Sequence, residues 1–149
     1  MSPFSISFRL VPDVRQGKGR AVGMLEGHPD LCAQTLITLP AKDAKYHRYS
    51  MERWTSGIDG PQERCHKFDG TDYFVFKNVG RQQRFYGFFC HPVPKNKSFI
   101  LCVLTTYAQK KGDRTDPADL GRVQAWMDAP ATKSAIKLIY PDIEKSEED

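Results

Sequence analysis

The chain has 149 residues, of which 40% are hydrophobic and 27% charged, and its formal net charge is +4. This length and balance are typical of a globular domain with one buried core, and they exclude a disordered or collagen-like chain. No run of about 18 apolar residues is present that would span a membrane, and the N-terminus lacks the pattern of a secretory signal. The four cysteines form no CxxC pair, so we expect reduced thiols, a cytoplasmic location, and neither a metal nor a cofactor.

The N-terminal half is expected to contain one strand and two helices. Residues Phe4 to Leu10 alternate apolar and polar side chains, which predicts a half-buried strand. Residues 11–27 match no period and indicate a loop that includes a mobile basic stretch. Asp30 is expected to cap a short helix, and residues 42–54 predict a second one. The solvent-facing side of this second helix is expected to carry Lys42, Lys45, His47 and Arg48.

The C-terminal half is expected to contain three strands followed by two helices. The strands are predicted over residues 73–76, 84–90 and 98–107. Their short connections favour antiparallel neighbours, and the run Phe99 to Leu104 is apolar on both faces, as in a strand covered on both sides. Asp116 and Pro117 suit the start of a helix, and residues 132–140 predict a weaker one. We expect one domain over residues 1–143, followed by a disordered acidic tail over residues 144–149.

Residues 77–115 are the most distinctive stretch of the chain. They contain eight Lys or Arg residues and a single acid, Asp113. Two apolar strands are thereby joined to basic ends. A cationic sheet surface of this kind is typical of proteins that bind phosphate groups.

Four features in this part of the chain occur together in a fixed order. They are the Leu39-Pro40 helix junction, the turn Lys67-Phe68-Asp69-Gly70, the strand Arg84 to Phe89, and the basic segment Tyr107 to Pro117. In this order and spacing the chain resembles, from about Leu36 to Trp126, the RelE/HigB superfamily of bacterial toxins, and within it the phage-derived HigB branch. The chain departs from that pattern at residues 11–31, at the inserted Asp116, and in the acidic tail.

The resemblance implies an α+β fold, the RelE-like toxin fold, in which helices pack on one face of a small antiparallel or mixed sheet. It also implies metal-free cleavage of mRNA, often on the ribosome, and a cognate HigA-like antitoxin with a helix-turn-helix domain. Arg84 matches the strand arginine beside the scissile phosphate. The remaining expected site residues are Lys110, Lys111 and Arg114 in the basic segment, and Lys77, Arg81 and Tyr107 as RNA contacts.

The sequence leaves other functions and roles open. A ParE-like protein would share the fold and inhibit DNA gyrase, and a phage-derived module of the same fold would bind a partner without catalysis. The alternative role of Arg84 is a salt bridge to an acid on a neighbouring strand, and that of Lys110 and Lys111 is a solubilising loop. His66 and His91 are suited by chemistry to proton transfer, but neither lies on a family motif, so the sequence does not assign the proton-transfer residue.

Overall fold

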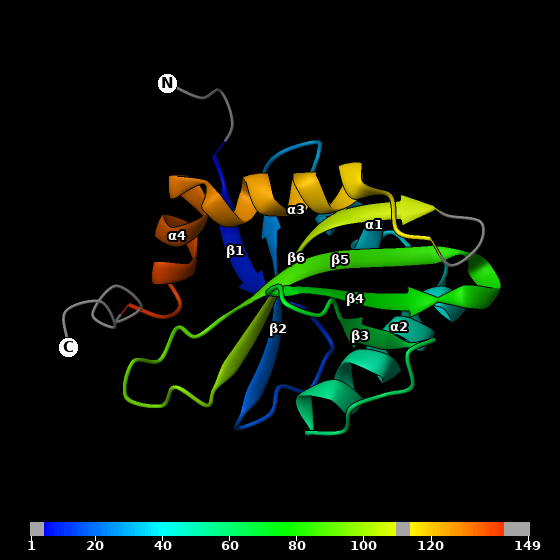
Figure 1. The fold of residues 1–149 in the computed structure, drawn as a ribbon, viewed down its shortest axis with the longest axis horizontal. Helices are drawn as coiled ribbons and strands as arrows, with labels where there is room; N and C mark the ends of the chain where they lie inside the picture. The colour runs from blue at the N-terminus through cyan, green and yellow to red at the C-terminus, as the bar shows by residue number, and fades with distance from the viewer. Residues whose placement is uncertain (1–4, 110–113, 142–149) are drawn as a thin grey trace.

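The computed structural model describes residues 5–109 and 114–141, and these residues form one six-stranded sheet with four helices (Figure 1). The strand order is β1-β2-β6-β5-β4-β3. Only β2 and β6 pair in parallel, and every other neighbouring pair is antiparallel. The strands are β1 Ser7–Leu10, β2 Arg20–Glu26, β3 Cys65–Lys67, β4 Tyr73–Asn78, β5 Gln83–Cys90 and β6 Ile100–Gln109. The helices are α1 Ala33–Ile37, α2 Ala41–Thr55, α3 Pro117–Asp128 and α4 Pro130–Lys137, with a 3-10 turn η1 at Val79–Arg81.

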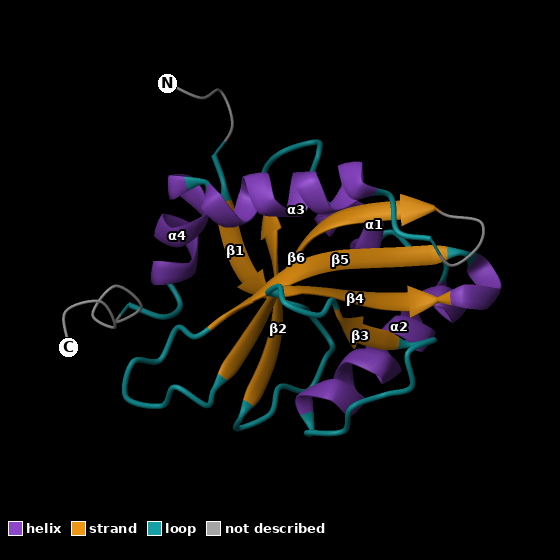
Figure 2. Cartoon of the chain, in the orientation of Figure 1, coloured by secondary structure: helices purple, strands orange, loops and turns teal. Residues whose placement is uncertain are grey.

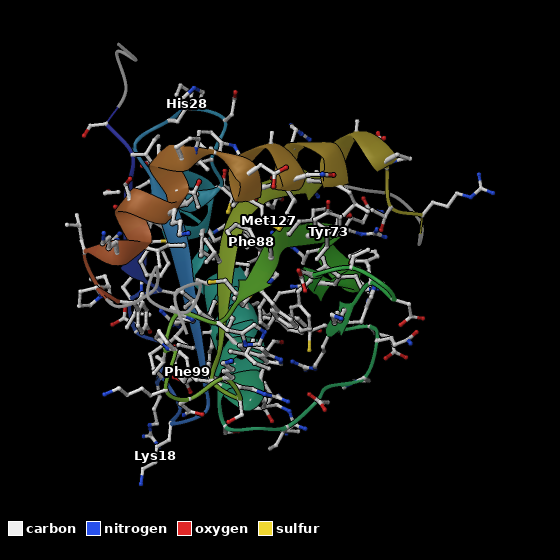
Figure 3. The ribbon with its side chains drawn as sticks, turned by 60° about the vertical axis from the view of Figure 1, so that its left-hand side comes forward. Lys18, His28, Tyr73, Phe88, Phe99 and Met127 are labelled. Carbon is white, nitrogen blue, oxygen red and sulfur yellow. The ribbon has the colours of Figure 1, made fainter. Side chains whose placement is uncertain are left out.

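Strand β2 lies within the stretch that matched no period in the sequence. Its five central residues are all buried, because both faces of the strand are covered. The loop before it is held in place as well, since the Gln16 side chain accepts from the Val22 amide at 2.8 Å and donates to the Val22 carbonyl at 3.2 Å. Lys18 extends from the outer end of this loop (Figure 3). The expected loop is therefore a central strand preceded by an ordered turn.

Helices cover both faces of the sheet, so the expectation that they pack on one face is wrong (Figure 2). On one face, α1 and α2 pack over a core that includes Val22 and Met24. On the other face, α3 and α4 pack over a core that includes Ala21 and Leu25. Because successive residues of a strand point to opposite faces, two apolar cores require the unbroken apolar runs of β2 and β6. The prediction that the run in β6 is covered on both sides is confirmed.

The helices begin and end near their expected positions, with two corrections. His47 on α2 was expected to face solvent, but it is 0% exposed, and Asp43 one turn earlier is only 5% exposed. Asp30 does not cap α1, whose N-cap position is taken by Cys32 without a side-chain cap. Asp116 caps α3 as expected, because its carboxylate accepts from a first-turn amide at 2.9 Å.

Candidate functional site at the hairpin end of the sheet

Four of the expected site residues lie at one end of the sheet. This hairpin end is where η1 joins β4 to β5 and where β6 finishes. Lys77 on β4 is directly opposite Arg84 on β5, and Tyr107 on β6 is opposite a neighbouring β5 residue. Arg81 lies in η1, and its carbonyl accepts from the Gln109 side chain of β6 at 2.8 Å. The tertiary structure therefore brings together residues that span three strands and a turn.

These residues do not share one face of the sheet. Lys77 and Arg84 lie on the face covered by α3, as does Tyr86 two residues farther along β5. Tyr107 lies on the face covered by α2, where its ring packs against Phe85 with 4.9 Å between ring centroids. The hairpin end thus presents a cationic part on one face and a phenol on the other, with η1 between them.

Lys77 and Arg84 form a pair of opposed, buried cations. The exposed fraction is 8% for Lys77 and 5% for Arg84. The Arg84 guanidinium donates to the Tyr86 hydroxyl at 3.3 Å and to the Thr115 hydroxyl at 3.5 Å. Neither β4 nor β6, the two strands next to Arg84, contains an acidic residue, so these strands offer no carboxylate for the salt bridge that is its alternative role. Two like charges facing each other across adjacent strands repel, and an anion placed between them is attracted by both.

His66 on β3 lies next to this cation pair. It is in register with Val75, which is in register with Tyr86, so the three share the α3 face and form one row across the sheet. Lys77 and Arg84 form the next row on the same face, two residues farther along β4 and two residues back along β5. The sequence signal for this placement is weak, because β3 is only three residues long and its pairing is known only from the tertiary structure.

The surroundings of His66 favour a neutral ring with one nitrogen able to accept a proton. Burial lowers the pKa of His66, and the positive charges of Lys77 and then Arg84 lower it further, while the Gln62 carbonyl and Asp69 act in the opposite direction. The Nδ1 atom lies 3.4 Å from the Gln62 carbonyl oxygen. Because a carbonyl only accepts, Nδ1 carries the hydrogen and Nε2 keeps its lone pair.

On the α2 face, a buried hydrogen-bonded network connects the helix to the hairpin end. Gln83 donates from Nε2 to an Asp43 carboxylate oxygen at 2.9 Å, and its Oε1 lies 3.0 Å from His47 Nε2. The other Asp43 oxygen lies 3.3 Å from Arg81 Nε. Burial lowers the pKa of His47, whereas the hydrogen bond to Gln83 and the Asp43 charge act in the opposite direction. Burial and the Asp43 charge both raise the pKa of Tyr107. The sequence did not single out Asp43, Gln83 or His47 as site residues, because their roles follow from contacts between residues about 40 positions apart.

The remaining expected site residues lie elsewhere or cannot be placed. Lys110 and Lys111 lie outside the described residues. Arg114 is exposed and directly precedes Thr115, which contacts the cation pair. His91 follows the far end of β5, where its ring bonds to a backbone carbonyl at 3.1 Å, so it does not belong to the hairpin end.

A groove of about 380 Å³, lined in part by His66, lies beside β3 and the loop that follows α2. Its walls include Trp54 and Phe89, whose rings stack with 5.4 Å between centroids. Arg20 also lines it, but its guanidinium is engaged by Asp59 at 2.9 Å and by the Trp54 carbonyl at 3.1 Å. The groove is thus mainly apolar, and its arginine is already paired.

The described residues contain no helix that is long and apolar enough to cross a membrane and no group of three or more His, Cys, Asp or Glu residues arranged to hold a metal ion. Comparison of the chain with protein-family models, with curated proteins and with solved structures found no match in any of the three.

Proposed function

We propose that this protein binds single-stranded RNA at the hairpin end and cleaves it, acting as the toxin of a toxin–antitoxin pair. The observation that carries the proposal is the opposed, buried pair Lys77 and Arg84, with His66 in the adjacent row of the same face. Two cations held in place by packing suit a phosphate that gains negative charge during a reaction. The resemblance of the sequence to RelE/HigB toxins points to the same chemistry.

The reaction requires a base, a means of stabilising charge, and protonation of the leaving group. His66 Nε2 takes the proton of a ribose 2′-hydroxyl, and the 2′-oxygen attacks the adjacent phosphorus. Arg84 and Lys77 stabilise the charge that develops on the phosphoryl oxygens. The bond from phosphorus to the 5′-oxygen breaks, and that oxygen takes a proton from water. The products are a 2′,3′-cyclic phosphate and a 5′-hydroxyl, and the imidazolium returns its proton to solvent.

Residues around the cation pair fit contacts with the rest of the strand. Arg81 has 62% of its side chain exposed, and Arg114 is exposed as well, so both are available to neighbouring phosphates. Tyr107 is half-buried, and the exposed part of its ring is available for a base to stack on. Lys110 and Lys111 remain expected contacts. A basic face of this kind also suits an acidic surface on a cognate antitoxin, with an association that weakens as salt is raised.

The test is induced expression in a bacterial host with mapping of new mRNA 5′ ends. We expect growth arrest and cuts within translated messages for the wild type, and neither for Arg84→Ala. The matched control is Arg9→Ala, which removes an arginine paired with Glu26 at the other edge of the same sheet. Both variants are first checked for cooperative unfolding. Arrest without cuts would favour gyrase inhibition, and neither arrest nor cuts would favour a non-catalytic binding module.

A second experiment examines His66. With purified protein and RNA, the cleavage rate is expected to rise with pH through the lowered pKa of His66, because only the neutral ring accepts the proton. His66→Gln should lose this rising limb while RNA affinity stays within about twofold of wild type. A wild-type pH profile retained in His66→Gln would remove His66 from the mechanism.

A further inference from the structure

We infer that Asp43, Gln83 and His47 are positioning residues that orient the Arg81 guanidinium for an RNA phosphate and fix the η1 turn against α2. The identity of the bound anion rests on the proposed function, whereas the positioning itself does not. The network also links the turn to the protonation of one fully buried histidine. Binding at the hairpin end is therefore expected to depend on residues that no RNA contacts.

The contact between Asp43 and Arg81 determines which atoms of the arginine face outward. The Asp43 side chain is 6% exposed and engages Nε, whereas 62% of the Arg81 side chain is exposed. With Nε engaged, the two terminal nitrogens can donate side by side to a phosphate. The same turn is held from β6 by Gln109, which donates to the Arg81 carbonyl at 2.8 Å. An arginine oriented in advance loses less side-chain entropy on binding than a freely rotating one.

The orientation of the Gln83 amide follows from its partners. A carboxylate only accepts, so the Gln83 nitrogen points to Asp43 and its oxygen points to His47. His47 Nε2 must then donate, which leaves Nδ1 as the acceptor nitrogen of a neutral ring. Nδ1 is buried and has no hydrogen-bond partner among the described residues. The bonds from His47 to Gln83 and from Gln83 to Asp43 are thus satisfied with neutral His47.

Adding a proton to His47 would place a charge on Nδ1 where the described residues provide no acceptor. The groups that act on the pKa of this ring are Asp43 of the same helix and Gln83 of β5, and the rings of Tyr46 of the same helix and Phe85 of β5 contact it. Asp43 is the only anion among these four. A proton on His47 would therefore draw Asp43 away from Arg81 and loosen the turn.

Amide hydrogen exchange on the full chain tests the positioning without RNA. The reporter is the Gln82 amide, which donates to the Val79 carbonyl within the turn at 3.1 Å. Asp43→Asn is expected to lower its protection factor by about fivefold, as for loss of one hydrogen bond. The control is Asp30→Asn, an exposed acid outside the network, and it should leave the protection unchanged. Unchanged protection in Asp43→Asn would overturn the inference.

Protonation is tested by the same measurement. The Gln82 protection factor should fall in wild type as pH decreases below about 6.5, because burial lowers the pKa of His47 below that ordinary value and the ring gains its proton only there. In His47→Phe, which retains an aromatic ring but does not titrate, protection should no longer vary over that range. A pH dependence that persists in His47→Phe would overturn the role of His47.

RNA binding separates positioning from charge. The probe is a short single-stranded RNA with 2′-O-methyl sugars, which cannot be cleaved. Asp43→Asn should weaken its binding by about fivefold with an unchanged slope of log affinity against log salt, whereas Arg81→Ala should reduce that slope by about 0.7. Arg81→Lys retains the charge at an exposed position, so it should show the same weaker binding and unchanged salt slope as Asp43→Asn. This second variant keeps the test possible if Asp43→Asn does not fold. The inference would be refuted if Asp43→Asn bound the RNA as tightly as wild type does. If the wild type bound no RNA, the proposed function would be refuted, and the hydrogen-exchange experiment alone would test the positioning.

Discussion

Replacing Gly87 with alanine tests how closely the two central strands approach each other. At this position the pairing of β5 with β6 is irregular, because Tyr86 pairs with Thr106 but Gly87 pairs with Leu104. A Cβ on Gly87 would lie 2.2 Å from the Val103 carbonyl oxygen, 2.8 Å from its carbon and 3.0 Å from the Leu104 Cα. These atoms are backbone, so no side-chain rotation relieves the clash.

The loss in free energy of unfolding follows from the backbone segments that the new methyl group would displace. Both faces of β5 and β6 are packed against helices, so neither strand can shift without disturbing a core. Forcing an extra carbon into a packed interior costs about 1–3 kcal/mol, and each ladder hydrogen bond that is lost adds about 1 kcal/mol. We expect Gly87→Ala to lower the free energy of unfolding by about 3 kcal/mol, a large part of the 5–15 kcal/mol that is typical of a native protein.

The assay is urea unfolding followed by far-UV circular dichroism and tryptophan fluorescence. Gly121→Ala provides the matched control, because it adds the same methyl group inside α3, where a Cβ meets nothing within 4 Å. Alanine is favoured over glycine in a helix interior, so this control should gain about 0.5–1 kcal/mol. If Gly87→Ala unfolds within about 1 kcal/mol of wild type, the steric reasoning is refuted.

Three further predictions concern stability and thiol reactivity. Because burial lowers the pKa of His47 below that of an unfolded histidine, the unfolded chain binds more protons, and the free energy of unfolding should fall as pH decreases below about 6.5. His66 contributes in the same direction, so His47→Phe should reduce this dependence without abolishing it, as measured by urea titrations over that range. Burial raises the pKa of Cys32 to about 12, so this thiol should react with a disulfide reagent at pH 8 only as fast as the protein unfolds; its immediate reaction in the native state would contradict this. Asp116→Ala removes the α3 cap and should cost about 1 kcal/mol in urea unfolding, whereas Asp116→Asn, which can still cap, should cost less.

Both faces of the sheet contribute to the candidate site, and a different helix supports the site residues on each face. The cation pair depends on α3 and the segment before it, since Thr115 contacts Arg84. The orientation of Arg81 depends on α2 through Asp43. A substitution on α3 is therefore expected to disturb the cation pair, and a substitution on α2 is expected to disturb the orientation of Arg81.

The sequence by itself determined the local elements with strong signals. Asp116 followed by a proline predicted the start of α3, and the pattern of residues 42–54 predicted α2 within one residue at each end. The apolar run in β6 predicted a strand covered on both sides. These signals depend on interactions within a few residues of the chain, such as a cap, a helical period or a short apolar run, so the sequence contains them in full.

Only the tertiary structure decided features that depend on distant partners. Strand β2 does not stand out in the sequence because its short apolar run contains Gly23 and shows no alternation, and its parallel pairing with β6 joins residues about 80 positions apart. His47 was expected in solvent because polarity alone does not reveal that Gln83, 36 residues later, pairs with it in the core. The sequence does not assign His66 to the site for the same reason, since its proximity to the cation pair depends on the register of three strands. The residue types of the site were thus recognisable in the sequence, but their arrangement was not, because long-range pairing places them and leaves no local period.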